Sequence, residues 1–177
     1  ISMAKNENVG PSQFTEQAEQ IFQRKIGEVY VEYQKRLLQA GAMDFDDLLM
    51  RTAQLFREHP DVLASWRHRF GHVLVDEYQD TNPVQNDLVL QLAEEHRQVT
   101  VVGDSDQSVY AFRGADIRNI LEFEEAFPDA TVVVLEQNYR STQSILDAAN
   151  AVIARNVGRK PKELWSDKGS GDKIVRY

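Results

Sequence analysis

The chain has 177 residues, and its 28 acidic side chains outnumber the 20 Lys and Arg, for a formal net charge of −8. This length fits one ordinary domain or parts of two, and the lack of Cys excludes a disulfide framework or a Cys-ligated metal. The acidic balance excludes a protein that coats nucleic acid by bulk charge. Without a signal peptide or an apolar run that could span a bilayer, we expect a cytoplasmic protein with no membrane partner.

The N-terminal part predicts a helical segment. Residues 1–12 carry Asn, Gly, Pro and Ser without periodicity, which predicts a loop. Apolar side chains then recur at helical spacing over residues 14–37, which predicts one amphipathic helix with Gly41 at its C-terminal end. Core packing is sufficient to explain this pattern.

The next stretch leads into the first predicted strand. Asp44 predicts the N-cap of a helix that ends at Pro60, and a shorter helix follows it. Residues 73–75 are apolar β-formers that run into polar turn residues, which predicts a strand buried on both faces. Asn82 before Pro83 predicts the start of another helix.

Residues 99–104 predict a second strand, again ending in an acid. A strand, a helix and a strand within about thirty residues predict a βαβ unit with a parallel strand pair, and so an α/β fold. The rest of the chain predicts a helix capped by Asp116 and closed by Pro128, a strand over residues 131–135, a helix capped by Ser141, and a strand over residues 173–177.

Each of the first three predicted strands ends in a polar cluster. Asp76 and Glu77 follow the first strand, residues 104–107 the second, and residues 137–140 the third. Because the carboxyl ends of parallel strands lie at one edge of a sheet, we expect the clusters to converge there. Phosphoryl transfer uses carboxylates that bind Mg²⁺ and activate a water, an amide that contacts a phosphate or the water, and an Arg that stabilises developing charge. The three clusters together contain all of these groups. The alternative is three solvated loops.

Aromatic side chains in polar surroundings give a second signal. Tyr110, Phe112 and Arg113 lie in a loop just after a strand end, and Tyr139 stands beside Arg140. A base stacked on an aromatic ring, with Arg beside it, is a common way to hold single strands. The alternatives are a core-filling Phe112, which we favour for that residue taken alone, and a half-buried Tyr139 at a strand end.

A phosphate-binding loop of the form G-x-x-x-x-G-K-[ST] does not occur in the 177 residues. A nucleotide hydrolase of this architecture needs such a loop, whose backbone amides and Lys hold the phosphates. The chain therefore holds half of a nucleotide site, and we expect it to have no ATPase activity by itself.

Three motifs resemble those of UvrD/PcrA/Rep-type superfamily 1 DNA helicases. The sequence DEYQDTN at 76–82 is similar to motif II of that family, VVGDSDQSVYAFRGAD at 101–116 to motif III, and LEQNYRST at 135–142 to motif IV. DFDDLL at 44–49 resembles the segment that joins the inserted helical subdomain to the first motor domain. The similarity covers essentially the whole chain and is greatest to PcrA and actinobacterial UvrD-type proteins.

The resemblance implies that the chain is a central fragment of a helicase core with an α/β, RecA-like P-loop NTPase fold and a helical N-terminal segment. Residues 1–41 would be the end of the inserted helical subdomain (1B-like). Residues 42–133 would be the C-terminal part of the first RecA-like motor domain (1A-like). Residues 134–177 would begin the second motor domain (2A-like).

The resemblance also implies roles at an ATP site. Asp76 would bind Mg²⁺ through water, and Glu77 would be the general base of hydrolysis. Gln107 would sense the γ-phosphate and couple it to DNA. Arg113 would reach the nucleotide region, and Arg140 would act as the arginine finger.

Aromatic residues take the remaining implied roles. Tyr139 would stack on adenine, while Tyr110 and Phe112 would contact single-stranded DNA. The family usually has Trp at the position of Phe112 and a larger polar residue at Ala111, so this contact is expected to be weaker here.

The implied activity is ATP-dependent 3′→5′ translocation on single-stranded DNA, with unwinding at single-strand/duplex junctions, in DNA repair or replication. Two alternatives stay open. One is a helicase–nuclease subunit of the RecB or AddA type. The other is a non-catalytic interaction fragment, which would self-associate through exposed sheet edges.

Overall fold

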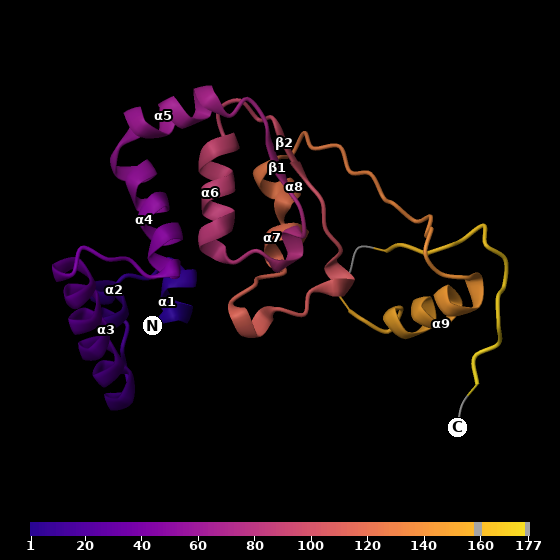
Figure 1. The fold of residues 1–177 in the computed structure, drawn as a ribbon, viewed down its shortest axis with the longest axis horizontal. Helices are drawn as coiled ribbons and strands as arrows, with labels where there is room; N and C mark the ends of the chain where they lie inside the picture. Colours follow the sequence, from indigo (N-terminus) through magenta and orange to yellow (C-terminus); the bar gives the residue numbers. More distant parts are fainter. Residues whose placement is uncertain (158–160, 176–177) are drawn as a thin grey trace. The chain divides into compact units, whose positions relative to one another are not determined.

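The computed structural model describes residues 1–157 and 161–175, and the chain divides into two compact units. The first unit is Ile1–Ala126 and the second is Phe127–Tyr177. Figure 1 follows both units along the sequence. No helix within the described residues is long and apolar enough to cross a lipid bilayer.

Three helices open the first unit, namely α1 (Ser2–Asn6), α2 (Pro11–Glu16) and α3 (Ile21–Gln39) (Figure 1). The predicted loop over residues 1–12 is therefore wrong, because α1 and the start of α2 lie within it. Pro11 occupies the first helical position of α2, where its fixed φ and missing N–H favour helix initiation.

The predicted single helix over residues 14–37 is divided between α2 and α3. The break has a local cause, since Gln20 and Gln23 form a reciprocal capping box that begins α3. The backbone N–H groups of Glu19 and Gln20 both donate to Gln23 Oε1 at 3.1 Å. Gly41 follows the helix with a left-handed φ of 61°, so its predicted place at the C-terminal end is confirmed.

Helices α4 (Phe45–Glu58) and α5 (Pro60–Arg69) follow. Asp44 is the N-cap of α4, as predicted, and its Oδ1 accepts the backbone N–H of Asp47 at 2.8 Å. Pro60 begins α5 and separates it from α4, because its ring is incompatible with a continuous helix.

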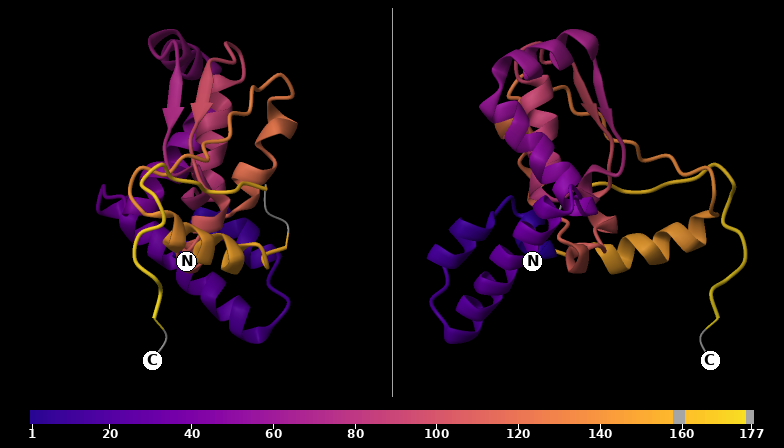
Figure 2. Two further views of the ribbon diagram at one scale, coloured as in Figure 1. Left: turned by 90° about the vertical axis from the view of Figure 1, so that its right-hand side faces the viewer. Right: turned by 60° about the vertical axis from the view of Figure 1, so that its left-hand side comes forward.

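A strand–helix–strand unit follows. β1 (Val73–Val75) and β2 (Val99–Val101) pair in parallel, with Val73 opposite Val99, and α6 (Pro83–Ala93) connects them. Figure 2 shows the two strands side by side, and the predicted βαβ unit is confirmed. A buried hydrophobic cluster of Met50, Ala53 and Val84 lies where α4 packs on α6.

The prediction that β1 is buried on both faces is wrong. Leu74 is 76% exposed, whereas Val73 and Val75 are partly buried, and α6 packs against the strand. Because side chains alternate along a strand, the face that bears Leu74 is uncovered among the described residues. Asn82 caps α6 as predicted, since its Oδ1 accepts the backbone N–H of Gln85 at 2.9 Å.

Two short helices, α7 (Arg118–Leu121) and α8 (Phe123–Ala126), take the place of the single helix expected after Asp116. Glu122 ends α7, because its backbone leaves the helical region at φ −98° and ψ 6°. Asp116 is not the cap that the sequence predicts, because the N-cap of α7 is Ile117, although Asp116 Oδ1 accepts the backbone N–H of Arg118 at 3.0 Å.

The second unit contains α9 (Gln143–Ile153). The strand predicted over residues 131–135 is wrong, since these residues form no strand in the described chain. A strand needs a hydrogen-bonding partner, and the pairing found in this unit is an isolated parallel bridge between Gln137 and Trp165. Residues 173–175 also form no strand, and the rest of that predicted element lies outside the described residues.

Ser141 does not cap α9 as predicted, because the N-cap is Thr142. Asn138 makes the preceding turn, and its Oδ1 accepts the backbone N–H groups of Arg140 at 2.9 Å and Ser141 at 2.8 Å. Ser141 is thereby held inside a turn centred on an Asn side chain, and the helix begins two residues later.

Candidate functional site

The first predicted cluster lies where β1 ends. Asp76 and Glu77 follow the strand directly, and both are exposed. Glu77 has a left-handed backbone with φ 50° and ψ 43°, and its N–H donates to Asp76 Oδ1 at 2.9 Å. A non-glycine residue in this region is strained, and such strain is common at functional sites. The turn leaves two carboxylates exposed just beyond the strand.

Buried residues directly after the acids anchor this turn. They form the short 3₁₀ helix η1 (Tyr78–Asp80), in which Tyr78 is fully buried. The Tyr78 ring packs edge-on against Phe123 with centroids 5.6 Å apart, and its hydroxyl donates to Asn86 Oδ1. Burial raises the pKa of Tyr78 to about 12, so this hydroxyl remains a donor at neutral pH.

The second predicted cluster lies just beyond β2. Asp104 caps the 3₁₀ helix η2 (Ser105–Gln107), and its Oδ1 accepts the backbone N–H of Asp106 at 3.0 Å. Gln107 Nε2 donates to Asp104 Oδ2 at 2.7 Å, while the Gln107 side chain stays exposed. The Asp104 carboxylate thus holds both the backbone of the turn and the side-chain amide of Gln107, a predicted site residue.

Gln79, which sequence reasoning missed, joins the two clusters. Its side-chain amide is 1% exposed and donates from Nε2 to Glu77 Oε2 at 2.8 Å. Its Oε1 accepts the backbone N–H of Asp104 at 2.9 Å. The structure therefore brings the first two predicted clusters together, as the parallel strand order predicts. The missed signal was a Gln inside the motif at 76–82 that begins with the two acids.

The third predicted cluster belongs to the second unit. Tyr139 is 71% exposed, which contradicts the half-buried alternative, and its hydroxyl donates to Gln137 Oε1 at 3.0 Å. Arg140 is also exposed, and its carbonyl oxygen accepts from Lys168 Nζ at 3.3 Å. Within this unit, the aromatic ring and the guanidinium are both accessible to a ligand.

The loop after η2 carries an exposed group of two aromatic rings and a guanidinium. Phe112 is 74% exposed and Tyr110 is 41% exposed, so the core-filling alternative for Phe112 is wrong. The Arg113 guanidinium lies 5.3 Å from the Tyr110 ring centroid and 5.5 Å from that of Phe112. The two centroids are 6.0 Å apart. The group therefore presents stacking surface and positive charge together.

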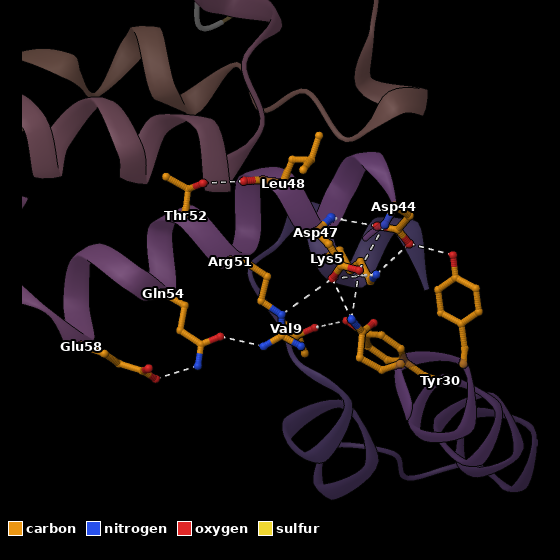
Figure 3. Close-up of polar contacts among 12 residues, drawn as sticks. Lys5, Val9, Tyr30, Asp44, Asp47, Leu48, Arg51, Thr52, Gln54 and Glu58 are labelled. Carbon is orange, nitrogen blue, oxygen red and sulfur yellow. Dashed lines mark hydrogen bonds and ion pairs between the residues drawn. The ribbon is translucent and has the colours of Figure 1, made fainter. Parts of the chain in front are cut away.

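A buried ion-pair network supports the start of α4 (Figure 3). Lys5 has no exposed surface, and its Nζ lies 2.7 Å from Asp44 Oδ2 and 2.9 Å from Asp47 Oδ1. Asp47 Oδ1 also accepts from Gln34 Nε2 at 2.9 Å. Burial, followed by the nearby Asp47 charge, raises the pKa of Tyr30 in this network to about 12. The network ties α1 and α3 to α4.

The same N-terminal helix α1 reaches residues near the candidate site. Asn6 Oδ1 accepts from Asn82 Nδ2 at 3.0 Å, at the start of α6. Asn6 also lies against Gly114, where an added Cβ would stand 3.3 Å from Asn6 Cβ. Gly114 follows Arg113 with a left-handed φ of 85°. These contacts link residues far apart in the sequence, which is why no local pattern predicted them.

The donor groups of the site suit a particular kind of metal binding. No cluster of three or more His, Asp or Glu that could enclose a metal ion occurs within residues 1–157 and 161–175. Mg²⁺ usually needs no such cage, because one or two carboxylates, waters and substrate phosphates complete its octahedron. The exposed Asp76 carboxylate beyond β1 fits that mode of binding.

Comparison with known sequences defines the class of protein. The family model for the UvrD/REP helicase N-terminal domain matches residues 1–128, and that for the UvrD-like helicase C-terminal domain matches residues 133–177. The chain therefore belongs to the UvrD/REP helicase family. The resemblance predicted from its three motifs is confirmed.

Individual relatives agree with this assignment over the whole chain. It is 52% identical to the ATP-dependent DNA helicase PcrA of Bacillus subtilis and 51% identical to PcrA of Leuconostoc citreum. It is 50% identical to the ATP-dependent DNA helicase UvrD1 of Mycobacterium tuberculosis. Each alignment covers all of this chain, which spans 24% of the length of each relative.

Proposed function

We propose that this chain is the central segment of a cytoplasmic, ATP-dependent DNA helicase that moves 3′→5′ on single strands and unwinds junctions in repair or replication. The observation that carries the proposal is the Gln79 link between Glu77 and Asp104 beyond two parallel strands. Open α/β sheets bind their ligands at this edge. Membership of the UvrD/REP helicase family supports ATP and DNA as ligands.

In this proposal the first unit supplies one side of an ATP site. ATP bound with Mg²⁺ supplies the phosphoryl group that is transferred to water. Asp76 holds Mg²⁺ through water, and Glu77 takes the proton of the attacking water as general base. Gln107 senses the γ-phosphate and relays its presence toward the DNA, and Arg113 reaches the nucleotide region.

The proposal also assigns parts of two RecA-like motor domains. Residues 1–41 end the 1B-like helical subdomain, residues 42–133 belong to the 1A-like motor domain, and residues 134–177 begin the 2A-like motor domain. Tyr139 stacks on adenine, and Arg140 is the arginine finger that stabilises charge on the transferred phosphate. Closing and opening of the two motor domains would move the DNA.

Tyr110 and Phe112 are the proposed contacts to single-stranded DNA. Their exposure and the neighbouring Arg113 guanidinium support this role, because bases stack on aromatic rings and phosphates attract the cation. With a formal charge of −8 this chain has no bulk attraction to DNA, so a nucleic-acid role needs local contacts of this kind or basic surface supplied by other segments.

The test is a Glu77→Gln variant of the full-length protein that contains this chain. The amide cannot accept a proton, so we expect DNA-stimulated ATP hydrolysis to fall on the order of 100-fold or more. Glu16→Gln, an exposed acid in α2, is the matched control and should retain the full rate. Unchanged hydrolysis by Glu77→Gln would contradict the proposed role of Glu77.

The isolated 177-residue chain gives a complementary test. We expect no ATP turnover by it, with or without DNA, because it contains no G-x-x-x-x-G-K-[ST] loop. Turnover that disappeared in the Glu77→Gln form of the chain would show instead that these residues are sufficient for hydrolysis.

A further inference from the structure

We propose that Gln79 is a positioning residue, which fixes the Glu77 carboxylate relative to the turn at residues 104–107. Glu77 then activates water beside Gln107, the proposed sensor of the γ-phosphate. The inference deepens the proposed function and rests on it. Gln79 itself is buried and would touch neither ATP nor the attacking water. Its effect on hydrolysis would pass through Glu77 and Asp104.

The hydrogen bonds of Gln79 determine the orientation of its amide. Nε2 donates to Glu77 Oε2 at 2.8 Å and to Asp80 Oδ2 at 3.3 Å, while Oε1 accepts the Asp104 N–H at 2.9 Å. An ionised carboxylate only accepts and a backbone N–H only donates, so the reversed amide would lose all three bonds. The amide therefore has one orientation in which every partner is satisfied.

Glu77 depends on such support because its surroundings do little to hold its side chain. It is exposed, it has left the strand, and its backbone is in the left-handed region. An exposed Glu side chain samples several rotamers, and a misplacement of about 1 Å can reduce a catalytic rate on the order of 100-fold. A hydrogen bond from a buried, immobile amide restricts those rotamers.

The oxygen of the Gln79 amide contacts the turn that follows β2. Asp104, whose N–H is held by Gln79, accepts from Gln107 Nε2 at 2.7 Å. A path of hydrogen bonds thus runs from the Glu77 carboxylate through the Gln79 amide to the Asp104 backbone N–H, and from the Asp104 carboxylate to the Gln107 amide. A shift of the turn at residues 104–107 would move the amide that holds the proposed base.

Gly103 makes room for this arrangement. A Cβ added at Gly103 would lie 2.6 Å from Gln79 Oε1 and 2.8 Å from Ile120 Cδ1, both too close for a real contact. Ser108 Oγ donates to the Gln79 main-chain carbonyl oxygen at 3.5 Å. The Gln79 side chain therefore fills a space that its neighbours leave for it.

The experiment uses two substitutions at position 79 in the full-length protein. Gln79→Met keeps the length of the side chain and removes its hydrogen bonds. Gln79→Glu keeps an acceptor for the Asp104 N–H but cannot donate to Glu77. The matched control is Gln91→Met in α6, where a partly buried amide donates to the Ala53 carbonyl oxygen at 3.4 Å.

We measure kcat and KM for DNA-stimulated ATP hydrolysis, the affinity for a fluorescent ATP analogue, and the melting temperature. Both Gln79 variants should lower kcat about 10- to 100-fold, because the base is misplaced, while KM and analogue affinity change less than about 3-fold. Gln91→Met should keep the original kcat. Unchanged kcat in the Gln79 variants, or a loss of analogue affinity and melting temperature that accounts for the lower rate, would overturn the inference.

A double-mutant cycle then separates this inference from the proposed function. In single-turnover assays, Gln79→Met should slow the original protein but not the Glu77→Gln variant, since its effect passes through Glu77. Equal slowing in both backgrounds would show that Gln79 acts elsewhere. Full activity of Glu77→Gln would overturn the proposed function together with this inference, whereas an inactive Glu77→Gln beside fully active Gln79 variants would overturn the inference alone.

Discussion

Lys5 is the residue whose charge is most completely enclosed by opposite charge in the first unit. Its Nζ contacts Asp44 and Asp47, and the Asp47 side chain is itself only 1% exposed. Taking three charges out of water is unfavourable, so the network is stable only while all its members are present. Lys5 thereby makes the folding of α4 dependent on α1.

We predict that Lys5→Met lowers the free energy of unfolding of the 177-residue chain by about 3–5 kcal/mol, because buried Asp47 loses the cation at 2.9 Å and keeps only the more distant Arg51 Nε at 3.9 Å. Urea unfolding followed by circular dichroism measures the change. The control is Lys25→Met, which removes an exposed ion pair to Glu28 and should change stability by less than about 1 kcal/mol. Equal effects of the two substitutions would contradict the role of burial.

At the candidate site, some residues could be predicted from the sequence and Gln79 could not. Asp76, Glu77 and Gln107 could be identified because their chemistry follows strand ends that the sequence makes visible. Gln79 could not, since its importance comes from contacts with Asp104, 25 positions away in the chain. A local pattern identifies which chemical groups are present, but not which buried side chain joins them.

Among the elements, the loop with η3 (Ala111–Arg113) has the clearest functional expectation. It holds Tyr110 and Phe112 exposed beside Arg113, and Gly114 closes it with a left-handed φ. A short turn therefore carries the aromatic stacking surface, and its backbone is closed by bonds from the Arg113 N–H to Tyr110 O at 2.8 Å and from the Gly114 N–H to Ala111 O at 3.0 Å. Such preorganisation favours stacking on bases.

We predict that Phe112→Ala in the full-length protein weakens single-stranded DNA binding by about 1–3 kcal/mol, or roughly 5- to 150-fold, as one stacked base is lost. Phe112→Trp should restore or strengthen binding, since its ring offers more stacking area. Fluorescence anisotropy with a labelled oligonucleotide measures both. Phe45→Ala, at a ring 89% exposed in α4, is the control and should bind normally. An unaffected Phe112→Ala would exclude the contact.

Two helix starts with a clear local signal were predicted well, whereas a strand that depends on a partner strand was not. Asp44 and Asn82 fix their helix starts through side chains three residues from their partners, so sequence alone identified them. Residues 131–135 have the composition of a strand but no partner strand in the described chain. The βαβ unit succeeded because its connection enforces a parallel pair.

At the scale of the whole chain, exposed apolar segments are prominent. Residues 132–135, which form no strand, are between 51% and 75% exposed, and Leu74 on β1 is 76% exposed. Apolar segments of high β-propensity that lack a partner favour pairing with another chain. The part of the chain that the structure describes therefore carries surface suited to self-association.

We predict that the 177-residue chain self-associates as its concentration rises. Val133→Lys should reduce this association, because a charge within the exposed apolar segment opposes pairing between chains. Light scattering across a concentration series measures the mean mass. Thr52→Lys in α4, which adds the same charge to the first unit, serves as the control. A strictly monomeric chain at every concentration would contradict the prediction.

Gly103 carries a consequence for how this protein tolerates sequence change. It is not in a left-handed conformation, so its own backbone would accept a side chain. The obstacles are the Gln79 amide oxygen and Ile120 Cδ1, which a methyl group at position 103 would displace. A mutational library selected for soluble expression would retain alanine at position 103, whereas one selected for helicase activity would reject it. Evolution at position 103 is thus constrained by the side chains at positions 79 and 120.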